Sequence, residues 1–358
     1  MEDIFIIVIN PGSTSTKIAV FQNEKSIFEK NITHSNAELA PFNKITDQFQ
    51  FRKQVVYNEL KALDLDLEKV KVVVGRGGMV KPIESGTYKV NEKMLQDLHN
   101  SPMGEHASNL GGLIAYEMAS DLPGAEAYIA DPVVVDEMED VARISGHPLF
   151  QRKSIFHALN QKATARNHAK KVGKAYEDLN MIVVHLGGGI SVGAHRKGKV
   201  IDVNHAIGGE GPFSPERSGT LPSVDLVNLC FSGQYSKEEI GKMLIGKGGL
   251  SAYLGTNSAM EAERRVKEGD AEATLIYDAM AYQVAKIIGE MYTVLECDVD
   301  YILVTGGIAY DKWFVNRIEF RVKKIAPLVV YPGENEMASL AMNGLNVITG
   351  RLQAQIYS

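Results

Sequence analysis

The chain has 358 residues, of which 45% are hydrophobic and 23% charged, a composition typical of a folded globular protein with room for two domains. Its net charge of -6 argues against a nucleic-acid partner, so an anionic ligand has to be held by local cations and backbone N–H groups. Two cysteines are too few for a disulfide framework. The short apolar run near the acidic N-terminus predicts neither a signal peptide nor a membrane span, so the expected compartment is the cytoplasm.

The first expected elements form a β-hairpin with a polar turn. A β-branched strand over 4–9 leads into a turn over 10–16, and strands over 17–21 and 26–32 follow. The turn is not a Walker P-loop, because the GxxxxGK[ST] spacing is absent and a strand follows. Its asparagine, hydroxyls and lysine suit phosphate oxygens. The candidate phosphate-binding residues are Asn10, Gly12, Ser13, Thr14 and Lys17.

Two buried strands in the first half end in polar residues. After a helix over 47–63, a strand over 70–74 runs into Arg76, at the edge where open α/β sheets place ligands. After a helix over 106–119, a strand over 128–130 ends at Asp131, and Pro132 marks the expected end of the first domain. A helix over 155–171 then carries His157 near its start.

A second glycine-rich hairpin follows at 181–203. Apolar residues flank the turn HLGGGIS, whose three glycines leave backbone N–H groups open to an anion. Because the same order of strands and turns occurs at 4–32, the sequence predicts two duplicated halves. Their phosphate-binding hairpins are expected to face each other across a cleft. A further glycine cluster (Gly208, Gly209, Gly211) precedes Arg217.

The remaining elements continue an α/β pattern. A capping box at Ser236 begins a helix to 245, a glycine-rich loop covers 246–256, and a long helix covers 271–295. A strand over 300–305 runs into Gly306 and Gly307 and then a helix, an arrangement that suits a nucleotide. A strand over 328–331 and a helix over 337–350 complete the order. The expected domains are 1–132 with 337–358, and 133–336.

These segments carry motifs in a characteristic order: NPGSTSTK (10–17), GRGG (75–78), ADP (130–132), IFHALN (155–160), HLGGGISVGAH (185–195), GEGPFSPERSG (209–219) and VTGGIAYD (304–311). Together they resemble the acetate and sugar kinase / Hsp70 / actin superfamily and, within it, the butyrate kinases. The resemblance covers nearly the whole chain. It implies an α/β, duplicated actin-like (ribonuclease H-like) two-domain fold with an interdomain cleft. It also implies the reversible phosphorylation of a short-chain carboxylate by ATP with Mg²⁺, which gives an acyl phosphate and ADP. Butyrate is the expected substrate.

The resemblance also implies roles for individual residues. Arg76, Asp131, His157 and Arg217 are the implied catalytic residues, and Arg76, Gly78, His106 and Phe156 the substrate-binding ones. The nucleotide and phosphate residues are those of the first turn with His185, Gly187, Gly188, Gly189, Gly209, Gly211, Gly306 and Gly307. Mg²⁺ is expected at Asn10, Asp131 and Glu336. Because a carboxylate is already ionised at pH 7, Asp131 is expected to orient the metal or its waters rather than to act as a base.

The expected acyl preference depends on one departure from acetate kinases and one from butyrate kinases. Glycines at 77 and 78, where acetate kinases carry valines, predict a pocket widened for a longer acyl chain, with Phe156, Phe213 and Pro215 as candidate walls. The segment NHAIGGEGPF, which contains His205 and Glu210, differs from the NNALDGDGPF expected of butyrate kinases. Isobutyrate or another branched acid therefore stays open.

Other activities remain as alternatives. An acetate or propionate kinase would share the motifs, and a sugar kinase would need Asp131 as a base. An Hsp70- or actin-like nucleotide clamp would need a client domain, which is not expected after the terminal helix, and would leave Arg76 and Arg217 without a purpose. The expected partners are a small carboxylate and a nucleotide, with no nucleic acid and no membrane. Self-association into at least a dimer is also expected from the resemblance.

Overall fold

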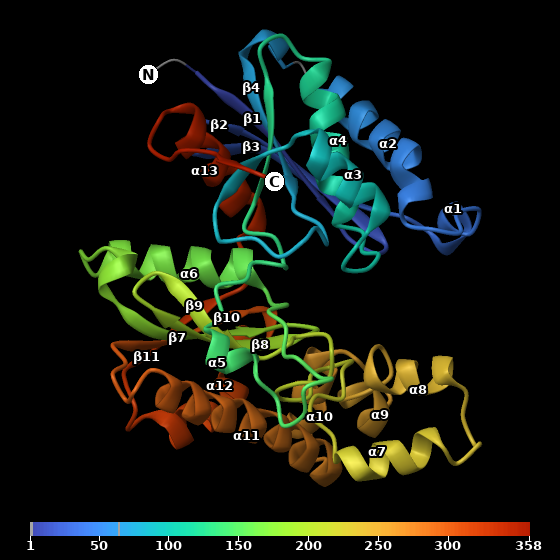
Figure 1. Cartoon of the computed structure of the whole chain (residues 1–358), viewed down its shortest axis with the longest axis vertical. Coiled ribbons are helices and arrows are strands. Elements are labelled where there is room, and N and C mark those ends of the chain that lie inside the picture. Colours follow the sequence, from blue (N-terminus) through green and yellow to red (C-terminus); the bar gives the residue numbers. More distant parts are fainter. Residues whose placement is uncertain (1–2, 64) are drawn as a thin grey trace. The chain divides into compact units, whose positions relative to one another are not determined.

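The computed structural model describes residues 3–63 and 65–358. These form two compact units (Figure 1). The first unit holds the described residues up to Val135 together with Asn335–Ser358, and the second is Asp136–Glu334. Each unit contains one mixed β-sheet and helices, which confirms the predicted α/β class. The predicted cleft between the halves stays a prediction.

The sheet of the first unit has the strand order β12-β5-β6-β4-β1-β2-β3 among the described residues. β1, β2 and β3 form the predicted antiparallel meander, while β4 runs parallel to β1 and β6 parallel to β4. The strands are β1 (Phe5–Pro11), β2 (Ser15–Gln22), β3 (Lys25–Thr33), β4 (Val70–Arg76), β5 (Thr87–Lys89), β6 (Glu126–Ala130) and β12 (Gln355–Ile356).

Two glycine contacts seat helices on opposite faces of β4. A Cβ at Gly111 of α4 would lie 2.4 Å from the Arg76 carbonyl oxygen, so this helix packs backbone to backbone on the strand that carries Arg76. A Cβ at Gly344 of α13 would lie 2.6 Å from Val74 Cγ2 on the other face. The helices of this unit are α1 (Asn36–Leu39), α2 (Phe49–Lys61), α3 (Glu92–Asn100), α4 (Asn109–Ser120) and α13 (Glu336–Ile348), with short 3₁₀ turns at Thr46–Gln48 and Leu67–Lys69.

The sheet of the second unit repeats this pattern with the order β11-β10-β7-β8-β9 in the described chain. β7, β8 and β9 form an antiparallel meander and β10 runs parallel to β7, as β4 does to β1. The repetition confirms the predicted duplication. The strands are β7 (Asn180–Leu186), β8 (Ile190–Arg196), β9 (Lys199–Val203), β10 (Tyr301–Gly306) and β11 (Leu328–Pro332).

Helices cover both faces of this second sheet. The long helix α11 buries Tyr277, Val284 and Ile288, spaced as one apolar stripe, against the face that contains Ile182. The helix α6 buries Ala165 on the opposite face. The helices are α5 (Asp140–Arg143), α6 (Ala158–Lys171), α7 (Ser223–Cys230), α8 (Lys237–Leu244), α9 (Leu250–Leu254), α10 (Ala259–Lys267), α11 (Ala271–Val294) and α12 (Lys312–Val322), with 3₁₀ turns at Tyr176–Asp178 and Gly307–Tyr310.

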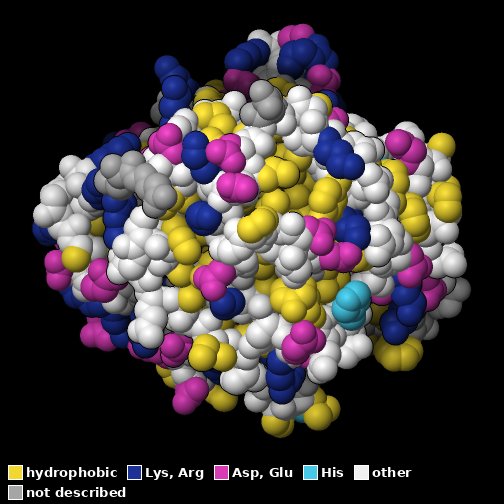
Figure 2. All heavy atoms as spheres, turned by 90° about the horizontal axis from the view of Figure 1, so that it is seen from above, with side chains coloured by type: hydrophobic (Ala, Val, Ile, Leu, Met, Phe, Trp, Pro, Cys, Tyr) yellow, Lys and Arg dark blue, Asp and Glu magenta, His cyan; other side chains and the backbone are white. Residues whose placement is uncertain are grey.

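Most predicted elements are present, with shifted ends. The capping box at Ser236 is formed, and His157 is the N-cap of α6 rather than a residue inside the helix. The glycine-rich segment 246–256, predicted as a loop, contains the short helix α9. In the described part of the chain no helix combines the length and apolar content needed to cross a membrane. The face shown in Figure 2 carries basic and acidic side chains intermixed, as expected from the modest net charge.

Candidate active site

Strand register brings three predicted residues to one edge of the first sheet. Ile9 pairs with Gly75, and Arg76 pairs with Ala130, so Asn10, Arg76 and Asp131 lie at the carboxyl ends of neighbouring parallel strands. Across the hairpin, Asn10 also pairs with Lys17. The Lys17 ammonium lies 3.0 Å from Glu29 on β3.

Arg76 holds a carboxylate in this structure, that of Glu336 at the first turn of α13. Its two terminal nitrogens lie 3.2 and 3.1 Å from the two Glu336 oxygens, a bidentate pair. Asn10 joins them: its amide nitrogen donates to Glu336 Oε2 at 2.6 Å, and its amide oxygen accepts from Arg76 Nη1 at 3.3 Å. The structure thus brings together one predicted substrate residue and two predicted metal residues.

Arg76 retains donors for a second anion. A guanidinium has five N–H groups. Contacts among the described residues occupy both N–H groups of Nη1 and one N–H group of Nη2. The Nε–H and the second N–H of Nη2 remain available as donors. These two donors form the second edge of the guanidinium and match a carboxylate in side-on geometry. Arg76 can therefore bind a substrate carboxylate while Glu336 stays in place.

Asp131 is fixed directly after β6. Its side chain is 1% exposed, and Oδ1 accepts hydrogen bonds from the Ser85 hydroxyl at 2.6 Å and the Gly86 N–H at 2.9 Å. The residue has φ of +39°, so the chain turns sharply there. Among the described residues no three His, Cys, Asp or Glu side chains are grouped to hold a metal by themselves. The oxygens of Asn10, Asp131 and Glu336 fit a Mg²⁺ that takes its other ligands from phosphates and water.

A buried arginine, not predicted from the sequence, supports the predicted first phosphate turn (10–16). Arg52 on α2 is 0% exposed and donates to the carbonyl oxygens of Gly12 (2.7 Å), Ser15 (2.7 Å) and Ser13 (2.9 Å). Burial lowers the pKa of Arg52 to about 10, which leaves it charged at neutral pH. The guanidinium therefore satisfies three carbonyl groups of the turn and places a buried positive charge next to its backbone. Arg52 could have been found from the sequence, because it lies four residues before Val56 on the buried face of α2.

We expect Arg52→Lys to destabilise the first unit and weaken nucleotide binding. A lysine cannot bridge three carbonyl groups, and each buried carbonyl left unpaired costs about 1–3 kcal/mol. The free energy of unfolding, measured by urea denaturation, should fall by about 2–4 kcal/mol, and the KM for ATP should rise. Lys61→Met, at the exposed end of the same helix, serves as the control. An unchanged urea midpoint in Arg52→Lys would contradict this role.

The predicted second phosphate turn (185–191) is tight and packs against Arg217. The Gly187 N–H donates to the Gly189 carbonyl at 3.1 Å, and the Ser214 hydroxyl donates to the Gly188 carbonyl at 2.6 Å. A Cβ at Gly189 would lie 1.7 Å from Arg217 Nη1, so the guanidinium fills the place of a side chain there. The turn therefore requires glycine because the arginine lies against its backbone.

Arg217 has an unsatisfied buried donor. Nη1 donates to the Ala206 carbonyl at 2.6 Å, whereas Nε is buried and has no partner among the described residues. Burial lowers the pKa of Arg217, and the neighbouring Glu216 carboxylate opposes that shift. A buried N–H without an acceptor is costly, so this geometry favours an anionic ligand beside the turn.

Among the other predicted nucleotide-binding glycines, three have positive φ and one lies beside open space. Gly306 has φ of +94°, and a Cβ there would lie 2.3 Å from the Leu186 carbonyl oxygen, so β10 and β7 meet closely. A Cβ at Gly307 would meet open space, which leaves the start of this 3₁₀ turn accessible. Gly209 and Gly211 have φ of +84° and +74°, conformations that favour glycine.

Two histidine rings stack at the ends of α6 and β7. The centroids of His157 and His185 lie 3.9 Å apart with ring planes 19° from parallel. His157 Nδ1 lies 2.9 Å from Ser191 Oγ, and His185 Nε2 lies 3.2 Å from Glu334 Oε1. His185 Nδ1 is buried with no partner among the described residues. Polar contacts thus fix the orientation of both rings.

The interpretation of Gly77 and Gly78 as the source of a widened pocket is wrong. A Cβ at Gly77 would lie 2.6 Å from the Pro132 side chain, and one at Gly78 would lie 2.5 Å from Asn109. The space that the missing side chains leave is filled by neighbouring residues, so these glycines permit close packing rather than an opening.

The remaining predicted substrate residues lie in different surroundings. His106 Nδ1 accepts from the Ser108 N–H at 3.2 Å, just before α4. Phe156, Phe213 and Pro215 are buried in the second unit. The site residues and walls assigned from the sequence therefore stay proposals.

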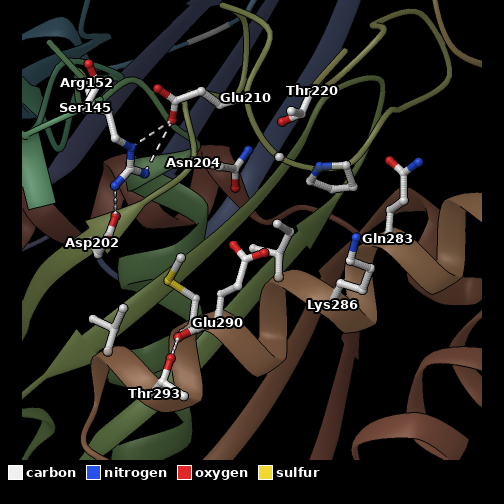
Figure 3. A pocket seen from close by; sticks show the side chains of 15 residues that line it. Ser145, Arg152, Asp202, Asn204, Glu210, Thr220, Gln283, Lys286, Glu290 and Thr293 are labelled. Carbon is white, nitrogen blue, oxygen red and sulfur yellow. Dashed lines mark hydrogen bonds and ion pairs between the residues drawn. The ribbon is translucent and has the colours of Figure 1, made fainter. Parts of the chain in front are cut away.

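A separate open hollow of about 750 Å³ lies beside β9 and α11 (Figure 3). Of the predicted site residues it includes Gly211 only. Its arginine, Arg152, is already paired with Asp202 at 2.9 Å and Glu210 at 3.3 Å. The lining also includes Lys286, but the carboxylates of Asp202, Glu210 and Glu290 outnumber the two basic side chains, so this hollow is poorly suited to an anionic substrate.

A family model and curated relatives match this chain. Residues 147–349 match the model of the acetokinase family. The chain belongs to the acetokinase family. It is 56% identical over 352 residues to a protein named butyrate kinase 2 of Clostridium acetobutylicum, covering 98% of this chain and 99% of that one. It is 55% identical over 352 residues to butyrate kinase 1 of the same organism, with the same coverage.

Solved structures of the acetokinase type share the fold. The acetate kinase of Porphyromonas gingivalis superposes with a TM-score of 0.78 at 18% identity, over 96% of this chain and 100% of that chain. A propionate kinase of Francisella tularensis subsp. tularensis SCHU S4 gives 0.75 at 18% identity, over 96% and 99%. Membership of the family confirms the predicted activity class, an ATP-dependent kinase of short-chain carboxylates. The nucleotide-clamp alternative is set aside.

Proposed function

We propose that this acetokinase family member converts ATP and butyrate reversibly into ADP and butyryl phosphate. The observation that carries the proposal is the identity of 56% and 55%, over nearly the full length, with two butyrate kinases. The acetate and propionate kinase structures share only 18%. Isobutyrate and other branched acids are the second candidates, because the departures at His205 and Glu210 lie in a loop of the second phosphate site.

The proposed chemistry needs cations rather than a base. A carboxylate oxygen forms a bond to the γ-phosphorus while the bond from that phosphorus to the β–γ bridging oxygen breaks, and ADP leaves with the electron pair. Butyrate is already ionised, so no proton has to be removed. Arg76 would hold the carboxylate on its free Nε–Nη2 edge, and Arg217 and His157 would donate to phosphoryl oxygens. The first and second turns would hold the nucleotide phosphates.

We also propose that the oxygens of Asn10, Asp131 and Glu336 are ligands of Mg²⁺. When bound it would neutralise charge on the nucleotide phosphates. Glu336 is kept in place for that task by Arg76 and Asn10, at 3.1 and 2.6 Å. Asp131, with Oδ1 held by Ser85 and Gly86, would orient the metal or its waters. Removal of Mg²⁺ with EDTA should abolish acyl phosphate formation, and its return should restore it.

Trapping the acyl phosphate with hydroxylamine tests the function. The full chain is assayed with ATP, Mg²⁺ and a series of acids from formate to valerate, with isobutyrate included. We expect the highest kcat/KM with butyrate. A maximum with isobutyrate would assign the branched acid, and a maximum with acetate or propionate would contradict the butyrate proposal within the same family. No hydroxamate with any acid would contradict the proposed activity.

We also propose that 1–132 with 337–358 and 133–336 act as the two functional domains, in the cytoplasm. The boundaries between the two compact units, after Val135 and after Glu334, support this division. Cys230 and Cys297 are exposed and form no disulfide, which fits a reducing compartment.

We further propose that the chain self-associates into at least a dimer. Val224, Val227 and Phe231, on and just after α7, are 72%, 54% and 86% exposed, and apolar residues gathered on a surface are typical of protein contacts. Light scattering should give at least twice the 39.2 kDa mass of one chain. Phe231→Glu should lower that mass if α7 contributes to the contact. A wild-type mass of one chain at all concentrations would contradict self-association.

A further inference from the structure

A buried chain of hydrogen bonds ends at His157. Tyr176 Oη lies 2.6 Å from His195 Nδ1, and His195 Nε2 lies 2.9 Å from Gln161 Oε1. Gln161 Nε2 lies 2.8 Å from Ser191 Oγ, which lies 2.9 Å from His157 Nδ1. Gln161, Ser191 and His195 are 0% exposed, so water does not compete for these groups. The direction of each hydrogen bond can therefore be worked out from the groups themselves.

Gln161 sets the direction of the first part of the chain. Its Nε2 also lies 3.1 Å from the Ser191 backbone carbonyl, which can only accept. The amide NH₂ group must therefore face Ser191, and the amide oxygen must face His195. Because an amide oxygen also only accepts, His195 Nε2 carries a proton. Burial, with the charges of Lys162 and Arg166, holds the pKa of His195 well below its usual value, so its Nδ1 accepts from Tyr176.

Ser191 sets the direction of the second part. Its oxygen accepts from the Gln161 amide, and its own hydrogen then needs an acceptor. Among the described contacts of Ser191 Oγ, the only group that can accept is His157 Nδ1, since Gln161 offers its nitrogen. A buried hydroxyl without an acceptor would cost about 1–3 kcal/mol. Ser191 therefore donates to Nδ1, and the neutral His157 ring carries its proton on Nε2.

We infer that Ser191 and Gln161, supported by His195 and Tyr176, are positioning residues that hold His157 in the Nε2–H tautomer. In that form the ring offers an N–H donor, rather than a lone pair, to a phosphoryl oxygen. Stacking on His185 fixes the plane of the ring, and the hydrogen-bond chain fixes where its proton lies. The importance of this for catalysis rests on the proposed role of His157.

The isosteric variant Gln161→Glu gives the sharpest test. A carboxylate has no hydrogen to donate, so it would accept both from His195 and from the Ser191 hydroxyl. Ser191 would then have only its lone pairs left for His157, and the His157 proton should move to Nδ1. Nitrogen-15 NMR of the full chain, labelled in histidine and assigned with His157→Gln, reads the tautomer directly. We expect Nε2–H in the wild type, Nδ1–H in Gln161→Glu and a mixture in Ser191→Ala.

Kinetics provide the second measurement. In Ser191→Ala and Gln161→Glu we expect kcat to fall by roughly tenfold, the scale of one lost hydrogen bond, with both KM values nearly unchanged. Ser191→Thr, which keeps the hydroxyl, should restore kcat and the tautomer. A wild-type His157 with its proton on Nδ1, or the same tautomer in all variants, would overturn the inference. If the tautomer reverses as expected but kcat in the variants and in His157→Gln is unchanged, the positioning stands and the proposed role of His157 fails.

Discussion

Arg76→Lys should lower kcat/KM for the carboxylate by about 10²–10³, the scale of a lost transition-state donor. Arg76 donates one edge of its guanidinium to Glu336 at 3.2 and 3.1 Å, and its Nε–Nη2 edge has no partner among the described residues, so a second carboxylate could bind there. A lysine retains the charge but has no planar fork, so it cannot hold two carboxylates at once. Steady-state kinetics should show most of the loss in kcat and in the KM for the acid, with a smaller change for ATP.

A matched control tests whether an arginine-to-lysine change elsewhere in the same unit affects the kinetics. Arg351→Lys alters an exposed arginine of the same unit that lies 3.6 Å from Glu24, and it should leave the kinetics unchanged. Circular dichroism of both variants shows whether the fold is retained. Arg76→Lys with kcat/KM within threefold of wild type would remove Arg76 from the proposed carboxylate site.

Arg217→Lys should reduce kcat by about 10²–10³ with little effect on the KM for the acid. The Arg217 guanidinium lies against Gly189 of the second phosphate turn, and its Nε has no acceptor among the described residues. A phosphoryl oxygen would supply that acceptor. A lysine loses both the Nε donor and the planar group that fills the space beside the glycine.

A second variant approaches the same contact from the other side. In Gly189→Ala the new Cβ would lie 1.7 Å from Arg217 Nη1, so the arginine must move and kcat should fall as in Arg217→Lys. Arg264→Lys, which changes an exposed arginine of the same unit paired with Glu261 and Glu268, is the control. Normal kcat in Arg217→Lys would show that this arginine does not contact the transferred group.

The sequence by itself determined the class of fold and the family. The two polar hairpin turns, at 10–16 and 185–191, are local patterns of β-branched residues, glycines and hydroxyls, so their structure follows from nearby residues. Duplication was visible because both halves repeat the same order of strands and turns. The residues at the ends of β1, β4 and β6 could also be placed, because parallel strands bring their carboxyl ends to one edge.

Only the tertiary structure decided how these residues are held. Glu336 reaches Arg76 from 260 positions away, and Arg52 on α2 reaches the first phosphate turn from 37 to 40 positions away. The space beside Gly78 is filled by Asn109, which overturned the widened pocket. The tautomer inferred for His157 depends on side chains from one strand (β8), one helix (α6) and a 3₁₀ turn. Such contacts join residues distant along the chain, and their geometry comes from packing, which no local pattern of residues specifies.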